Sequence, residues 1–216
     1  MIFKEIDSKE ASEFLIVRHY SGRIPSISKA FGIYEDEKLA AVCTFGKPAS
    51  PSLCIGVCGR EYSSCVYELN RLCREEWFLS PLSQFVAWCL RQLKPLNWII
   101  VSYSDTAMNH HGYVYQACNF IYTGETKART DMYTMNGKHS RHYKLNEQTG
   151  YRKVRSAKHR YIFFCTGNKK LKKEWIRNLR YSPCTFHKGD NSNYILGTVL
   201  KDQIVLDSRI KEGEGE

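Results

Sequence analysis

Residues 66–103 read VYELNRLCREEWFLSPLSQFVAWCLRQLKPLNWIIVSY, and their pattern predicts a strand, a helix and a second strand. Residues 66–73 alternate in polarity as a strand does. Ser80 is suited to cap the helix and Pro81 to its first turn, and apolar residues then recur at three- and four-residue spacing until Pro95 ends the helix. Residues 98–103 are a continuous apolar run, which is typical of a strand buried on both faces. The unit predicts an α/β fold.

Weaker patterns on both sides extend this unit. Ser8 can cap a helix that continues to Val17, and residues 30–34 and 39–45 form a predicted hairpin. Residues 46–59 are rich in Gly, Pro and Ser and are expected to form a long loop. Further predicted elements are a loop and helix over 105–118, a strand over 120–122 and a helix over 169–180.

Composition excludes several classes of protein. The chain has 216 residues and is 43% apolar, so it can bury a core and is not wholly disordered. It has no uncharged apolar run of membrane length, and its first residues are acidic where a signal peptide is apolar. We therefore expect a soluble protein that is not exported. The nine cysteines include no C-x-x-C pair and are expected to be reduced.

The net charge of +10 is concentrated in one segment. Residues 127–188 hold 17 Lys and Arg against 3 Asp and Glu, whereas residues 1–126 are nearly neutral. We expect 1–126 to be a catalytic core, 127–188 a basic extension packed on it, and 189–216 a C-terminal strand and acidic tail. Basic and aromatic residues alternate in the extension, which favours nucleic-acid binding over a merely solvated basic face. The candidate contacts are Arg152, Lys153, Arg155, Lys158, Arg160, Lys169 and Lys170.

Several motifs of the chain resemble the phage Mom-like DNA modification proteins. The longest is HHGYVYQACNFIYTG at residues 110–124, and the others are ELNRL at 68–72, SYSD at 102–105, HYSGRIP at 19–25 and TFG at 44–46. The resemblance covers roughly residues 15–125, with a weaker echo in SAKHRY at 156–161.

The resemblance implies an acyltransferase fold of the GNAT type, with a mixed central sheet flanked by helices. It also implies an enzyme that converts adenine in phage DNA to N6-carbamoylmethyladenine and so hides the DNA from host restriction enzymes. The expected partner is double-stranded DNA, the expected location is the cytoplasm of the infected bacterium, and no membrane is involved. A homodimer is left open. Because the amino group of adenine is hidden in a duplex, such an enzyme has to flip the base or act on distorted DNA.

The same resemblance implies roles for individual residues. Tyr115 falls where the fold often keeps a tyrosine as general acid, although core packing explains it equally well. An acyl-CoA-type donor would be held by Arg71, Arg74, Ser80 and Ser83, because the usual Gly-rich pyrophosphate loop is absent between Arg71 and Phe85. For Arg71, a surface ion pair with a nearby glutamate is the alternative. A CH₂–CONH₂ unit also requires an activated carbon rather than a thioester, so the true donor stays unknown.

Polar residues near the ends of predicted elements complete the candidate site. Asp105 ends the buried strand, where catalytic groups of open α/β sheets gather, and could accept a proton from adenine or simply cap the next helix. Tyr20 is placed with Asp105 and Tyr115 in the catalytic group. His19 and Tyr20, with Asp105 or His110, are also candidate ligands of iron. The alternative for His19 is a DNA phosphate contact or a helix cap.

Two rival functions remain at this level. One is an acetyl-CoA-dependent N-acetyltransferase that acts on RNA or protein. The other is a non-catalytic DNA-binding protein that uses the basic segment.

Overall fold

A seven-stranded mixed sheet forms the centre of the computed structural model, which describes residues 1–133, 149–186 and 203–207. Only β4 and β5 pair in parallel; every other neighbouring pair is antiparallel. In sheet order the strands are β1 (Ile2–Ile6), β2 (Lys29–Glu35), β3 (Lys38–Gly46), β4 (Val66–Arg74), β5 (Trp98–Asp105), β9 (Lys158–Cys165) and β6 (Ile121–Glu125).

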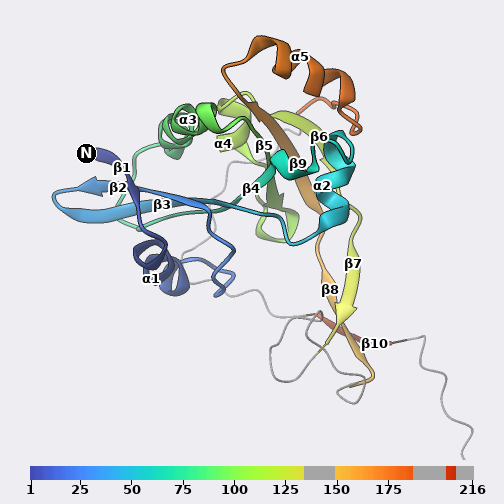
Figure 1. Cartoon of the computed structure of the whole chain (residues 1–216). Coiled ribbons are helices and arrows are strands. Elements are labelled where there is room, and N and C mark those ends of the chain that lie inside the picture. The colour runs from blue at the N-terminus through green and yellow to red at the C-terminus, as the bar shows by residue number, and fades with distance from the viewer. Residues whose placement is uncertain (134–148, 187–202, 208–216) are drawn as a thin grey trace, which may run out of the picture.

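Helices cover both faces of this sheet (Figure 1). Alternate residues of the strands point to opposite faces, so each face packs against its own helices. Phe85 of α3 and Tyr115 of α4 belong to the core on one face, while Phe14 of α1, Val57 of α2 and Trp175 of α5 belong to cores on the other. The helices are α1 (Ser8–Arg18), α2 (Pro51–Cys58), α3 (Leu82–Leu93), α4 (Tyr113–Ala117) and α5 (Lys169–Asn178), with short 3-10 turns η1 (Ser63–Cys65), η2 (Lys94–Leu96) and η3 (Thr106–Met108). The predicted mixed α/β fold is confirmed.

Local details differ from the sequence prediction at three places. Asp7, not Ser8, caps α1, because its carboxylate accepts hydrogen bonds from the N–H groups of Lys9 and Glu10, each 2.8 Å long. Pro81 occupies the cap position of α3, so Ser80 does not cap that helix. The expected loop over 46–59 contains α2, whose start is marked by the side chain of Ser50 and by a proline in the first turn.

The basic segment contributes to the sheet itself. Strand β9 lies between β5 and β6 and pairs with β5 over its full length, from Lys158 opposite Asp105 to Cys165 opposite Trp98. A second, three-stranded sheet in the order β10-β8-β7 projects from the core (Figure 1). Its strands are β7 (Arg129–Met132), β8 (Tyr151–Arg155) and β10 (Ile204–Leu206). The predicted acidic tail, 211–216, lies outside the described residues.

The two parallel strands stop pairing before they end. Pairs join residues 66–69 of β4 to residues 99–102 of β5, the last being Leu69 with Ser102. Beyond that point β4 continues to Arg74 beside β3, and β5 continues to Asp105 beside β9. The carboxyl ends of the two central strands therefore separate, which leaves room for a site between them.

Candidate functional site

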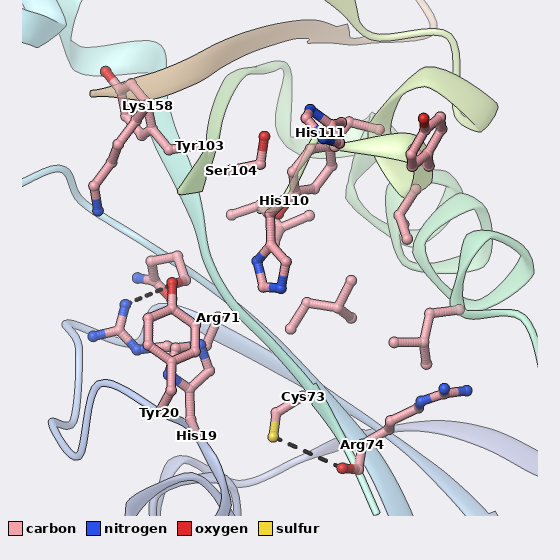
Figure 2. Close-up of a pocket in the computed structure, with 18 of the residues that line it drawn as sticks. His19, Tyr20, Arg71, Cys73, Arg74, Tyr103, Ser104, His110, His111 and Lys158 are labelled. Atoms are coloured by element: carbon pink, nitrogen blue, oxygen red, sulfur yellow. Dashed lines mark hydrogen bonds between the residues drawn. The ribbon is translucent and has the colours of Figure 1, made fainter. Parts of the chain in front are cut away.

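A cavity of about 400 Å³ occupies the gap between the ends of β4 and β5. This volume lies within the range of small-ligand pockets, roughly 300–1,000 Å³. Figure 2 shows the imidazole of His110 near the centre of the labelled side chains, with His19, Tyr20 and Arg71 in the lower left and Lys158 and Tyr103 in the upper left. The polar residues that line the cavity include His19, Tyr20, Glu68, Arg71, Arg74, Tyr103, Ser104, His110, Tyr115 and Lys158.

Tyr115 lies at the point where the strands separate. Its ring is buried against Phe120 and Tyr161, and it also lines the cavity. The hydroxyl of Ser102 donates a 3.0 Å hydrogen bond to the carbonyl oxygen of Leu69, which ties the last pair of residues together. Burial raises the pKa of Tyr115, and a hydrogen bond with Ser102 opposes this shift only in part. The phenol is therefore protonated and able to donate a hydrogen bond or a proton.

Of the four residues predicted to hold a donor, the cavity gathers two. Arg71 and Arg74 line it from β4, whereas Ser80 and Ser83 are not among its lining residues. Arg71 donates a 2.6 Å hydrogen bond to the carbonyl oxygen of Asn70 and a longer one to that of Arg23. Its position on the cavity wall supports a role with a ligand rather than the surface ion pair considered above; Glu75 pairs with Arg18 instead.

His19 and Tyr20 follow α1 and stack on each other, with ring centroids 4.4 Å apart. The backbone N–H of His19 caps the end of α1, and its Nδ1 accepts a hydrogen bond from the N–H of Ser21. Burial, with the positive charge of Arg71 next in size, lowers the pKa of His19 to about 3. Burial and then Asp105 raise the pKa of Tyr20 to about 12. Both rings are therefore neutral at neutral pH.

The lowered pKa of His19 predicts a pH-dependent stability. Between about pH 6.5 and pH 3 the unfolded chain binds a proton at this site that the folded protein does not, so stability falls as the pH falls. We expect His19→Gln to remove about 1 kcal/mol per pH unit from the slope of unfolding free energy between pH 6 and pH 4. Urea titrations at several pH values measure this slope for the wild type and for His19→Gln. Equal slopes contradict a lowered pKa of His19 in the folded protein.

Asp105 is held by the protein itself. Its carboxylate accepts hydrogen bonds from the Ala107 N–H at 3.0 Å and from the Ser156 hydroxyl at 2.5 Å, and it pairs with Lys158 at 3.4 Å. It caps η3, which is the alternative role predicted from the sequence. It is not among the residues that line the cavity. Asp105 therefore fixes the cavity wall at Lys158.

Three of the four candidate iron ligands meet at the cavity. His19, Tyr20 and His110 all reach the cavity, and the rings of Tyr20 and His110 lie 6.2 Å apart. Within the described residues, however, no group of three or more His, Cys, Asp or Glu is placed to hold a metal ion. The oxygens of Asp105 already have partners, and Asp105 is the one candidate that does not line the cavity.

The cavity residues include buried polar atoms that have no hydrogen-bond partner among the described residues. Two of them are Nε of Arg71 and the hydroxyl oxygen of Ser104, whose residue is only 5% exposed. An unsatisfied buried polar group costs about 1–3 kcal/mol, and proteins keep few of them. A polar ligand in the cavity would satisfy both atoms.

The predicted DNA contacts fall into four groups. Arg152, Arg155 and Arg160 are held by internal partners: Asp207, Asp131 and Thr123 respectively. Lys158 lines the cavity. Lys169 and Lys170 are exposed on the first turn of α5, beside further exposed cations of the same helix at positions 172, 173 and 177. Lys153 lies half-buried on β8.

The family model described as the Mom protein family matches residues 1–186 of the chain. The chain belongs to the Mom protein family. The match spans the whole central sheet, the cavity and α5, so every residue of the Mom-like motifs discussed above lies inside it.

Solved structures of similar fold include acetyltransferases. One from Bacillus subtilis in complex with CoA has 15% identity and a TM-score of 0.45, with 75% of the Mom chain and 97% of its own covered. A putative acetyltransferase from Salmonella typhimurium with acetyl-CoA has 6% identity and a TM-score of 0.48, with 78% and 95% covered. This likeness concerns the fold alone. No curated protein matches the chain in sequence.

Several cavity residues of this Mom protein were not singled out from its sequence. Glu68, Tyr103 and Ser104 lie inside the quoted motifs but were given no role there. The signal that locates them is the loss of pairing between β4 and β5, which depends on the neighbouring strands β3 and β9. No described helix is long and apolar enough to cross a membrane.

Proposed function

We propose that this Mom family protein converts adenine in phage DNA to N6-carbamoylmethyladenine and so protects the DNA from host restriction. The observation that carries the proposal is a small-ligand cavity between β4 and β5 that joins a protonated phenol, two arginines and unsatisfied polar atoms in a Mom family chain. An adenine flipped out of the duplex offers both hydrogen-bond donors and acceptors to such a site.

The lining residues divide by their chemistry. Arg71 and Arg74 would pair with phosphate groups of the donor, since guanidinium groups suit phosphate recognition. An acyl-CoA-type donor would fit them, and the bound donor would supply the carbon that is transferred. Tyr115, protonated and buried, would donate its proton to the group that leaves. The aromatic pair of His19 and Tyr20 offers a flat, neutral surface on which a base can stack.

Exposed lysines of α5 would hold the DNA backbone. We expect a Lys169→Ala/Lys170→Ala double variant to bind duplex DNA more weakly and to lower the slope of log affinity against log salt by about 2, because each lysine releases about one counterion. Fluorescence anisotropy at several salt concentrations measures the slope. The control is Lys9→Ala/Lys38→Ala, which removes two exposed charges elsewhere on the surface. An unchanged slope in the α5 variant contradicts this placement.

Resistance to restriction tests the proposed function. Plasmid DNA from bacteria that express the protein is expected to resist restriction enzymes whose recognition sites contain adenine, while plasmid from cells with the empty vector is cut. Sites built only of G and C serve as the internal control and are expected to be cut in both samples. Complete cutting at every site, in cells that contain the folded protein, contradicts the proposal.

A further inference from the structure

The cavity holds a carboxyl group that neither the motifs nor the charge pattern assigns to the chemistry. In the described part of the chain, the carboxyl groups that line the cavity belong to Glu68, Glu75 and Glu76. Glu75 is paired with Arg18, and Glu76 is exposed to solvent. Glu68 is half-buried on β4, and its side chain has no hydrogen bond or ion pair with any described residue.

The pairing register of β4 and β5 determines the face of the sheet on which the side chain of Glu68 lies. Glu68 lies directly beside Val101 of β5, so its side chain shares a face of the sheet with Val101 and Tyr103. That face is the one covered by α2 and α5, whereas Tyr115 belongs to the core of the α3 and α4 face. Glu68 and Tyr115 thus approach the gap between the strands from opposite faces of the sheet.

We propose that Glu68 is the proton acceptor for the adenine amino group, with the base entering from the face that carries α5. This inference rests on the proposed function and deepens it. Helix α5, which carries the exposed lysines, packs on the same face of the sheet as Glu68, so DNA held by these lysines would lie on this side of the sheet. Asp105, the acceptor expected from the sequence, already has three partners and lies outside the cavity lining.

The environment of Glu68 suits this role. Burial raises its pKa, while the positive charges of Arg71 and Lys158 act in the opposite direction and favour the carboxylate. A carboxylate whose pKa is raised takes up a proton more readily than an ordinary surface carboxylate. Glu75 and Glu76 lack this combination of burial and nearby cations, since the first is committed to Arg18 and the second faces water.

The step balances with an electrophilic carbamoylmethyl donor, written X–CH₂–CONH₂. The adenine nitrogen forms a bond to the CH₂ carbon as the bond from that carbon to X breaks, and X leaves with the electron pair. One N–H proton moves to the Glu68 carboxylate, and the nitrogen keeps the other. Tyr115, on the opposite face, can protonate X.

Substitutions at Glu68 separate base catalysis from a structural role. We expect Glu68→Gln to lower the amount of modified deoxyadenosine in DNA of expressing bacteria by about 100-fold or more, the usual contribution of a general base. Glu68→Asp keeps a carboxylate and is expected to retain clearly more activity than Glu68→Gln. Both variants are expected to bind duplex DNA as the wild type does. Glu61→Gln, which removes an exposed carboxylate elsewhere, is the matched control and is expected to match wild type.

The outcomes are distinct. Wild-type levels in Glu68→Gln, with a modified base present, overturn the role of Glu68 and leave the proposed function standing. Equal losses in Glu68→Gln and Glu68→Asp at matched amounts of folded protein also overturn it, because shape rather than the carboxylate then matters. No modified base with the wild-type protein overturns the proposed function itself and this inference with it.

Discussion

Replacing Gly112 by alanine is expected to lower the free energy of unfolding by about 2–5 kcal/mol and to abolish the modification of DNA. Gly112 has φ of 72°, which costs other residues about 1–2 kcal/mol. A Cβ atom there would overlap the ring of Tyr161, with Cζ only 2.7 Å away. Tyr161 is fully buried, so it cannot turn aside, and overpacking of this kind typically adds 1–3 kcal/mol.

The loss of activity follows from what this contact holds in place. The hydroxyl of Tyr161 donates a 2.5 Å hydrogen bond to the carbonyl oxygen of His111, and Gln116 donates to the same carbonyl. Shifting the Tyr161 ring therefore displaces the segment that carries His110 into the cavity.

Alanine substitutions at two other glycines separate the cost of the positive φ from the cost of the clash. Gly22 also has a positive φ, but an added Cβ there would meet open space; Gly167 has open space and no positive φ. We expect a cost of about 1–2 kcal/mol for the first and less than about 0.5 kcal/mol for the second. Thermal melting and urea titration measure all three variants. A Gly112→Ala protein as stable as Gly22→Ala contradicts the expected clash.

Tyr115→Phe is expected to reduce the modified base by about 100-fold or more while DNA affinity stays unchanged. The substitution removes one hydroxyl and keeps the ring that packs against Phe120 and Tyr161. Because burial raises the pKa of this phenol, the group that is lost is a proton donor throughout the physiological pH range. If Tyr115 served packing alone, phenylalanine would leave the modification intact.

The matched control for this prediction is Tyr122→Phe. Tyr122 is also buried and also packs on Tyr161, but its hydroxyl contacts His159 and it does not line the cavity. We expect Tyr122→Phe to modify DNA as wild type does. Mass spectrometry of nucleosides and an anisotropy measurement of DNA binding check both variants. Equal losses of modification in the two contradict a specific role of Tyr115.

Much of the fold could be predicted because its decisive signals are local. The alternation in β4, the spaced apolar residues of α3 and the apolar run of β5 each lie within a single element. The position of β9 could not be predicted in this way. Its place between β5 and β6 is set by long-range pairing, and the basic residues around it drew attention to charge instead.

The candidate site could likewise be predicted only in part, because some of its features depend on long-range contacts. The cavity gathers His19, Tyr20, Arg71 and Tyr115, which lie in the quoted motifs, because the segments that carry them meet around the strand gap. Sequence alone could not show that Asp105 is already bound by Ser156 and Lys158, since those partners come from a distant strand and the residues before it. Nor could it show that Glu68 has no such partner among the residues that the structure describes.

The most direct test of the account is the nucleoside composition of DNA from bacteria that express the protein. Complete enzymatic digestion followed by mass spectrometry is expected to reveal a deoxyadenosine that carries one added carbamoylmethyl group, absent from cells with the empty vector and from cells with Tyr115→Phe. Unmodified deoxyadenosine throughout, in cells that contain the folded wild-type protein, contradicts the account.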